Sequence, residues 1–273
     1  MNSVNTNVGA MVALQQLNKT NSDLFEVQGR INTGKRINSA KDNGAIWAIA
    51  QNQRATSSSL NTVKESLQRA VSTVDVALSA GESVSDLLLQ MKDKALAASD
   101  TSLDTAARDA LNADFKSLRD QVGKVVANAE FNGINLLKSG AANLTALANA
   151  TGTKMTVQAQ VMALGGSVVT VAAAASIGTA GAASTMVATL NTSIANVSAS
   201  LSKLGTGSKS ISQHLNFVGK LQDTIDAGVG NLVDADLAKE SARLQSLQTK
   251  QQLGVQALSI ANGSSQILLG LFR

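Results

Sequence analysis

The chain has 273 residues and a net charge of +4, with no Pro, no Cys, one His and only 2% aromatic residues. Because Pro breaks helix interiors, its absence favours long uninterrupted helices. The lack of Cys excludes disulfides and thiolate metal sites, and the single His, His214, cannot form a His-rich metal cluster. The weak positive charge comes without a dense basic run or an aromatic platform, so nucleic-acid binding is not predicted.

The first expected helix lies before residue 34, where Leu17, Leu24 and Ile31 repeat every seven residues. The segment ahead of it has neither the basic start nor the continuous apolar run of a secretory signal. We therefore expect an amphipathic helix here.

The sequence at the end of this helix nearly matches the motif of a phosphate-binding loop. Gly29, Gly34 and Lys35 fit G-x-x-x-x-G-K, but Arg36 stands where a hydroxyl should bind magnesium. No strand pattern precedes the glycines, and the helical pattern from Leu17 continues through them. We therefore interpret this stretch as something other than a nucleotide site.

Two rows of apolar or small residues at seven-residue spacing predict a coiled-coil helix from about residue 39 to residue 99. The rows are Leu60, Leu67, Val74, Gly81, Leu88, Ala95 and Val63, Ala70, Ala77, Val84, Met91, Ala98. A second helix follows, with Ser102 or Asp104 as its N-cap, and ends near a turn at Asn132-Gly133.

The amino-acid composition changes between residues 139 and 202, where Lys154 is the only charged residue. Residues 154–161 alternate in polarity, which predicts a strand with Gln158 and Gln160 on its polar face. Residues 167–173 are a second strand candidate and residues 143–148 a weaker one. We expect a small β-hairpin insertion in a helical protein.

A third long helix is predicted by two further rows at heptad spacing, one from Val187 to Val229 and one from Leu190 to Leu232. Residues 251–272 contain no charge, and their apolar side chains fall on every side of a helix, so such a helix must be buried all round. Its many amides and hydroxyls are costly in a membrane. Other copies of the same chain could bury it, which favours a polymer.

Several segments closely resemble bacterial flagellin: RINTGKRINSAKDNGAIWAIA near the N-terminus, AEFNGINLL, and the ending DADLAKESARLQSLQTKQQLGVQALSIANGSSQILLGLF. The similar segments cover residues 1–138 and 184–273 in the family's order, and their sequence is similar to that of the short alphaproteobacterial type. The resemblance implies a mainly α fold, a long antiparallel coiled-coil bundle with paired N- and C-terminal helices and a small β-hairpin insertion.

The resemblance also implies three domains along the chain. Residues 1–33 and 233–273 would form the inner core, residues 34–138 and 184–232 a rod-like helical domain, and residues 139–183 a reduced outer region. The implied function is that of a secreted structural subunit that assembles into the extracellular flagellar filament for motility. It is not that of an enzyme, and no cofactor is implied. The alternative is a hook–filament junction protein of the same superfamily.

The partners implied by the resemblance are other copies of the chain, the filament cap, the hook-junction proteins, the flagellar type III export apparatus and an export chaperone; membrane insertion is not expected. The expected assembly-core residues are Leu17, Leu24, Ile31, Leu237, Leu244, Leu247, Leu258, Leu268 and Phe272. The expected spoke segment, which joins core to rod, includes Arg30, Gly34, Lys35, Arg36, Lys41 and Asp42. Possible glycosylation sites in the outer region are Ser167, Thr170, Ser176, Thr179, Ser184 and Thr185.

One family feature is altered. Many flagellins carry Arg-Glu-Leu on the first long helix, where an innate immune receptor binds, but this chain has Lys92, Asp93 and Lys94 in that region. Lys in place of Arg loses the bidentate guanidinium fork, and Lys in place of Leu removes an apolar contact. We therefore predict weak or absent receptor activation.

Overall fold

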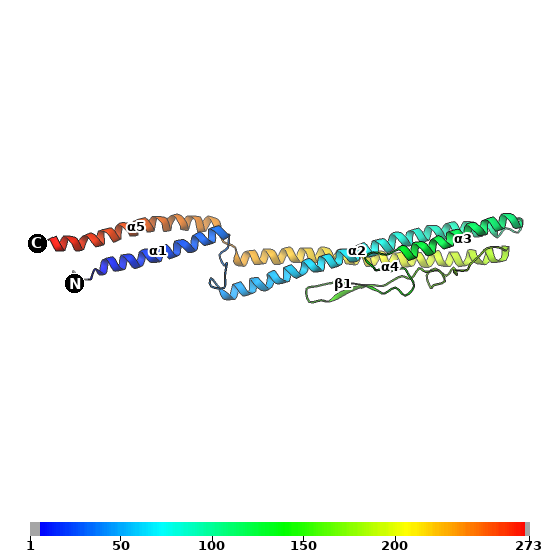
Figure 1. Ribbon diagram of the computed structural model, residues 1–273, viewed down its shortest axis with the longest axis horizontal. Helices are drawn as coiled ribbons and strands as arrows, with labels where there is room; N and C mark the ends of the chain where they lie inside the picture. The colour runs from blue at the N-terminus through cyan, green and yellow to red at the C-terminus, as the bar shows by residue number, and fades with distance from the viewer. Residues whose placement is uncertain (1–5, 271–273) are drawn as a thin grey trace. The chain divides into compact units, whose positions relative to one another are not determined.

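The computed structural model describes residues 6–270, with side chains as far as residue 263. In this part of the chain there are five helices and one two-stranded antiparallel hairpin (Figure 1). The elements in order are α1 (Val8–Thr33), α2 (Gly44–Ala98), α3 (Thr105–Asn128), β1 (Leu144–Leu147), β2 (Lys154–Val157), α4 (Ala180–Val233) and α5 (Leu237–Gly270). The predicted mainly α fold with a hairpin insertion is confirmed.

Short polar side chains and one glycine set the helix ends. Asn7 Oδ1 accepts a hydrogen bond from Ala10 N at 3.0 Å, which caps α1, and Gly34 ends it with a φ of 67°. Glycine adopts this left-handed conformation without a steric penalty. Of the two predicted caps for α3, Asp104 is the one used, because its Oδ1 accepts from Ala107 N at 2.7 Å.

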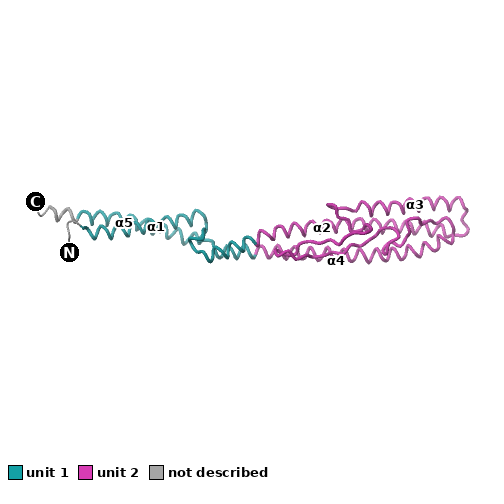
Figure 2. The backbone as a smooth tube through the Cα atoms, turned by 60° about the horizontal axis from the view of Figure 1, so that its bottom comes forward, with its two compact units in different colours: residues 1–55, 224–273 teal, residues 56–223 magenta. Residues whose placement is uncertain are grey.

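The chain divides into two compact units (Figure 2), one of residues 1–55 with 224–273 and one of residues 56–223. In the first unit, α1 and α5 lie side by side and in opposite directions (Figure 1). A separate core in the same unit joins Ile37 and Ala50 to Val229 near the end of α4.

The core of the second unit follows the predicted heptads of α2. All twelve positions of the two rows are buried, from Leu60 and Val63 to Ala95 and Ala98. Phe115 and Val122 bring the apolar stripe of α3 into this core. Narrow stripes of this kind stabilise a helix only when they pack on one another, so the three helices fold as a bundle.

The helix α4 buries a row that the sequence did not single out. The predicted row from Leu190 to Val218 is buried, but the predicted row beginning at Val187 is only half-buried up to Gln222. The insertion lies instead over a third row, Ser193, Ser200, Gly207 and His214, in which the two serines are buried and the other two residues are half-buried. Small or polar side chains let the insertion approach closely.

The hairpin corrects the predicted strand pair. Residues 143–148, the weaker candidate, supply β1, which pairs with β2 in a register that sets Leu144 opposite Val157. Residues 167–173 are not a strand. Val169 and Val171 are buried against the bundle, while Thr170 N donates to Ser193 Oγ on α4 at 3.0 Å, so the alternation reflects packing on a helix.

The second strand is also shorter than predicted. After Val157 the chain leaves β1, and Gln160 N donates to Leu136 O at 2.9 Å. This change of partner turns Gln160 inward, so that it is buried although the alternation placed it on the polar face. Its Nε2 donates to Ala159 O at 3.1 Å, which satisfies the buried amide.

Candidate functional site

The predicted assembly-core residues lie along the seam between α1 and α5. Leu24 and Val27 of α1 and Leu247 of α5 form its buried centre, with Ile31 and Leu244 packed against them. Four of these five residues, all except Val27, are among the predicted assembly-core residues. The seam is thus an apolar contact between two helices that are far apart along the chain.

The remaining predicted core positions fall into three groups. Leu17 and Leu258 are half-buried farther along the same seam. Leu237 is exposed, whereas Glu240, which was not predicted, is buried at the seam. Glu240 stands seven residues before Leu247, so extending that row backwards would have found it. Two predicted positions lie outside the described side chains, Leu268 and Phe272.

An ion pair closes the seam at this end. Arg30 Nη1 lies 3.3 Å from Glu240 Oε1, and the same guanidinium also pairs with Glu26 one turn earlier on α1. Glu240 is 8% exposed, and its Oε2 is buried without a hydrogen-bond partner among the described residues. A buried carboxylate oxygen without a donor costs stability, so this position is unusual.

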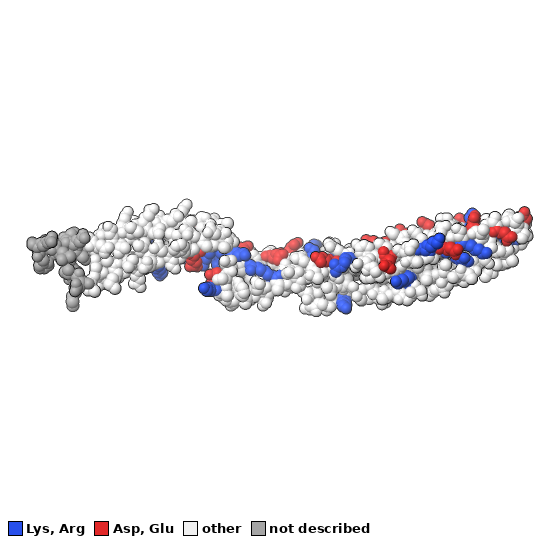
Figure 3. Space-filling model, viewed as in Figure 1, with Lys and Arg blue, Asp and Glu red and all other residues white. Residues whose placement is uncertain are grey.

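The outer sides of both terminal helices are apolar and open to solvent. Phe25 on α1 is 73% exposed and Ile260 on α5 is 74% exposed. The face of this helix pair seen in Figure 3 carries few charged side chains. The other exposed apolar residues of the pair are Val8, Met11, Val12, Leu14, Leu237, Leu253 and Val255. Exposed apolar surface of this extent is typical of a protein interface.

The predicted spoke segment pairs with the chain between α4 and α5. Lys35 and Asp234 form an isolated antiparallel bridge, and Arg36 N donates to Val233 O at 2.7 Å. The Arg36 Nη2 atom donates to Leu232 O at 3.1 Å. The spoke is thereby fixed to the end of α4 and the residue that follows it.

Asp42 closes the loop that leads into α2. Its Oδ2 accepts hydrogen bonds from Ser39 N and Asn38 N, each at 2.9 Å. These backbone donors, with Ser39 the larger contribution, hold the pKa of Asp42 below its ordinary value of 3.8. Its neighbour Lys41 is exposed. Arg30 and Arg36 border the same shallow hollow as Asp42, which has a volume of about 230 Å³.

The geometry does not make this hollow a phosphate loop. Gly29 lies inside α1, so its N–H belongs to the helix ladder and cannot take part in a backbone cradle. The Thr33 hydroxyl donates to Gly29 O at 2.8 Å. The Arg36 guanidinium is held by the carbonyl of Leu232.

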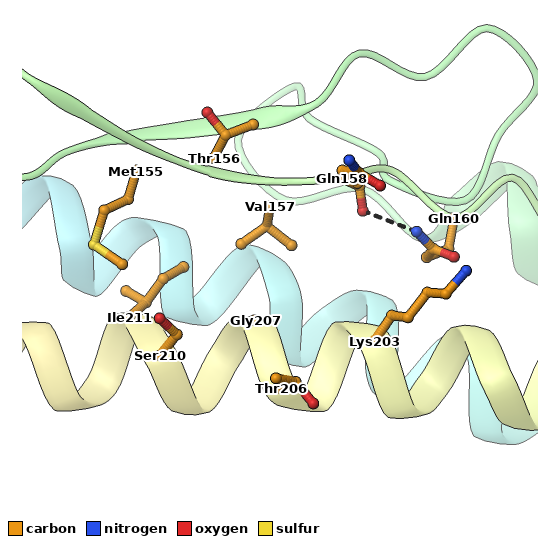
Figure 4. Close-up of a pocket in the computed structure, with 10 residues that line it drawn as sticks. All are labelled: Met155, Thr156, Val157, Gln158, Gln160, Lys203, Thr206, Gly207, Ser210 and Ile211. Atoms are coloured by element: carbon orange, nitrogen blue, oxygen red, sulfur yellow. Dashed lines mark hydrogen bonds between the residues drawn. The ribbon is translucent and has the colours of Figure 1, made fainter.

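The insertion lies on α4 beside a hollow of about 290 Å³ (Figure 4). The side chain of Val157 points toward Gly207, and a Cβ added to Gly207 would lie only 3.0 Å from Val157 Cγ1. Lys203 is the only charged residue that lines the hollow. The other polar residues that line it carry hydroxyl or amide groups.

The six candidate glycosylation residues are all exposed, but their hydroxyls differ. Thr170 Oγ1 lies 2.8 Å from Ser193 Oγ, and Thr179 Oγ1 accepts from Ala182 N at the start of α4. Thr185 Oγ1 donates to a backbone carbonyl of its own helix at 3.0 Å. The hydroxyls of the other three residues make no hydrogen bond within the described part of the chain, and these are Ser167, Ser176 and Ser184.

The residues at the altered receptor motif lie on α2. Asp93 is exposed and Lys92 is half-buried. Lys94 Nζ lies 2.7 Å from Asp114 Oδ2, which links α2 to α3. This lysine is therefore engaged within the chain.

The described residues hold neither a membrane-spanning helix nor a cluster of metal-binding side chains. None of the helices there contains an apolar stretch long enough to cross a bilayer. Nor do three or more His, Asp or Glu side chains gather there in a way that could hold a metal ion. His214 is half-buried, and its Nε2 lies 2.6 Å from Ala148 O.

Known proteins resemble the chain over its whole length. The description "Bacterial flagellin N-terminal helical region" matches residues 4–143, and "Bacterial flagellin C-terminal helical region" matches residues 187–272. Flagellin FljM of Caulobacter vibrioides is 60% identical over 273 residues, which covers 100% of this chain and 99% of that protein. A flagellin of Brucella melitensis is 36% identical over 283 residues and is covered completely.

Among solved structures, a flagellar hook-associated protein from Vibrio parahaemolyticus aligns with a TM-score of 0.59. The alignment covers 71% of this chain and 100% of that one, at 16% sequence identity. At this identity the likeness shows a shared helical fold and nothing about function.

The family matches cover both helical regions, and the full-length relatives are flagellins. The chain therefore belongs to the bacterial flagellin family, and it is a structural subunit that polymerises with itself into the extracellular filament of the flagellum.

Proposed function

We propose that the pair of α1 and α5 is the inner core of the filament, made by residues 1–33 and 233–273. Residues 34–138 and 184–232 then form the rod-like domain, and residues 139–183 a reduced outer region. The observation that carries this proposal is the exposed apolar side of both terminal helices, from Val8 to Phe25 and from Leu237 to Ile260.

The free energy of burying this surface favours polymerisation. Covering one exposed aliphatic or aromatic side chain contributes roughly 1.5–3 kcal/mol, and each copy presents several on both helices. Identical copies that cover one another through non-closing contacts produce a helical filament. The uncharged stretch of residues 251–272 avoids burying charges in that core.

The spoke segment holds this core to the rod. Arg30 and Arg36 are anchored within the chain, whereas Lys41 and Asp42 are exposed beside them. In the filament, the exposed members of the segment contact neighbouring subunits. Gly34 supplies the left-handed turn that ends α1 and begins the segment.

The remaining partners follow from the proposed place in the flagellum. The chain passes through the flagellar type III apparatus, is held by an export chaperone at its C-terminal helix, and adds beneath the filament cap, with hook-junction proteins at the base. Its role there is structural rather than enzymatic. Any glycosylation falls on Ser167, Ser176 or Ser184, because their exposed hydroxyls are not engaged by the protein; intact-mass analysis of native filaments tests this assignment.

Seeded polymerisation tests the core assignment. The variant Val255→Ser/Ile260→Ser removes two exposed apolar side chains of α5, and Gln256→Ser changes an exposed polar residue of the same helix as its matched control. We expect the first variant to stay monomeric at concentrations where the parent and the control form long filaments in electron micrographs.

A truncation that lacks residues 233–273 should likewise fail to polymerise while the second unit keeps its helical circular dichroism. Filaments of normal length from the Val255→Ser/Ile260→Ser variant would contradict the proposal. Short closed rings from the parent chain would instead favour a junction protein.

A further inference from the structure

The apolar seam between α1 and α5 does not by itself select one alignment of the two helices. The row on α5 that faces α1 consists of Glu240, Leu247, Gly254 and Ala261, at seven-residue spacing. A shift of one heptad keeps apolar rows facing each other, because both helices repeat with the same period. Leu244 and Leu258 also lie at the seam, whereas Val255 and Ile260 point away from it and would be as exposed in either alignment.

Three polar links cross the seam, and all agree on one antiparallel alignment. Near one end of the pair, Asn7 Nδ2 donates to Ala261 O at 2.7 Å. In the middle, Gln251 Nε2 donates to Asn21 Oδ1 at 2.8 Å. Near the other end, the Arg30 guanidinium pairs with Glu240 at 3.3 Å. The links are spaced along nearly equal lengths of both helices.

A shift of one heptad would break these links. With Gly254 now opposite Leu17, the shift would bring Ala261 to Leu17 and Leu247 to Arg30. Glu240 would move past the end of α1 at Thr33, and Arg30 would face Leu247 without this partner. Breaking a buried pair by removing one partner is strongly destabilising, because an uncompensated buried charge remains.

Stability alone does not explain the Arg30–Glu240 ion pair. Glu240 is almost completely buried, and its Oε2 has no hydrogen-bond partner among the described residues. Replacing a buried ion pair with apolar residues is often neutral or stabilising, whereas a polar group at a seam can specify register. The energetic cost of burying Glu240 is therefore explained if Glu240 selects one alignment of α1 and α5.

We infer that Arg30–Glu240 and Asn21–Gln251 are register-specifying pairs, which select one alignment of α1 and α5. The inference rests on the proposed function, since a filament whose core is this helix pair needs every copy in the same alignment. Identical alignment gives every subunit the same outer surface to present to its neighbours. The seam leucines supply the buried apolar surface, and these pairs select the alignment of α1 and α5.

The absence of Cys from the chain allows a direct measurement of register. A Cβ built on Gly254 lies 3.9 Å from Leu17 Cβ, within the separation of about 3.5–4.5 Å that a disulfide requires. Leu17→Cys/Gly254→Cys therefore reports the observed alignment. Leu17→Cys/Ala261→Cys reports the alignment shifted by one heptad. Both are made in the full-length chain, polymerised from seeds and oxidised, and the intrachain disulfides are counted by peptide mass spectrometry.

The register-specifying pairs are then replaced together by apolar residues, with Arg30→Met, Glu240→Leu, Asn21→Leu and Gln251→Leu in one variant. A matched control removes an exposed ion pair of the second unit, Lys94→Met/Asp114→Leu. In the parent and in the control we expect the observed-alignment disulfide to exceed the shifted one by about tenfold or more. In the apolar variant we expect this ratio to fall at least about fivefold, through a rise in the shifted product.

An unchanged ratio in the apolar variant would overturn the inference, because the seam alone would then set the alignment. Loss of both disulfides in that variant would also overturn it, since the pairs would then be needed for pairing itself. If seeded filaments of the parent background formed neither disulfide, α1 and α5 would not be paired in the polymer. That result would overturn the proposed core as well, so the two failures are distinguishable.

Discussion

A Cβ added to Gly81 of α2 would lie 2.6 Å from Leu201 Cδ2 of α4, closer than real side-chain atoms approach. The terminal methyl carbon of Met162, from the insertion, lies 3.3 Å from the same point. Gly81 occupies one position of an otherwise apolar heptad row. It therefore marks the level at which α4 and the insertion close together onto α2.

We predict that Gly81→Val destabilises the second unit. The added isopropyl group would force Leu201 and Met162 to move, and overpacking of this kind typically costs about 1–3 kcal/mol. Gly205→Ala is the control, because Gly205 lies inside α4 with no atom near its missing Cβ, and it should stabilise by roughly 0.5–1 kcal/mol. Urea unfolding measures both, and a Gly81→Val chain as stable as the parent would contradict the close contact.

The sequence was sufficient for the helices because their burial follows one period. Every position from Leu60 to Ala98 that the heptads placed inside is buried, and the Asn132-Gly133 turn has the positive φ angles, 51° and 80°, that these residues tolerate. These features depend on neighbours within a few residues. Local pattern therefore specifies them.

The packing of the insertion and the ion-pair partner of Glu240 could not be predicted in the same way. Residues 167–173 alternate like a strand, but the alternation comes from packing on Ser193 and its neighbours along α4, which is a long-range relationship. Glu240 occupies a seam position because Arg30, distant along the chain, accompanies it. In both cases a polar partner far away in the sequence decides the burial.

We predict that His214 holds the tip of the hairpin on α4. Its Nε2 lies 2.6 Å from Ala148 O, and Leu147 N donates to Ser66 Oγ at 3.1 Å on the other side. The variant His214→Ala removes one hydrogen bond worth about 1 kcal/mol, so amides of β1 should exchange about fivefold faster. Ser72→Ala, which removes a hydroxyl bonded only to its own helix, is the control and should leave them unchanged.

Unchanged exchange in His214→Ala would show that the apolar contacts of the insertion suffice. Ser66→Ala should produce an effect similar to that of His214→Ala, because it removes the acceptor for Leu147 N. Hydrogen exchange with mass spectrometry resolves the peptides that contain β1.

We predict that Asp42 makes an acid-sensitive contribution to the stability of the spoke segment. Backbone donors lower its pKa below 3.8 in the folded chain, so its contribution is fully present above the unfolded pKa. The contribution is lost as the pH falls through the folded pKa. We expect Asp42→Asn to be less thermally stable than the parent at pH 6, with the difference shrinking below about pH 4.

The carboxyl resonance of Asp42 should titrate with a midpoint below 3.8 in a pH series followed by NMR. Lys41→Gln is the matched control, because it changes an exposed neighbouring charge without removing the acceptor for Ser39 N. A stability difference between Asp42→Asn and the parent that persists undiminished at pH 2 would contradict this assignment.

The altered motif on α2 predicts weak activation of the innate immune receptor for flagellin. Lys92 cannot supply the bidentate fork of an arginine, and Lys94 carries a charge where the Arg-Glu-Leu motif has an apolar leucine. The combined change Lys92→Arg/Asp93→Glu/Lys94→Leu restores the motif and should raise signalling by purified monomer in a reporter-cell assay. Breaking the contact of Lys94 with Asp114 is unavoidable in that variant, so Asp114→Asn serves as its control. If the parent chain signalled as strongly as the restored variant, recognition would have to rest on other residues of the helix.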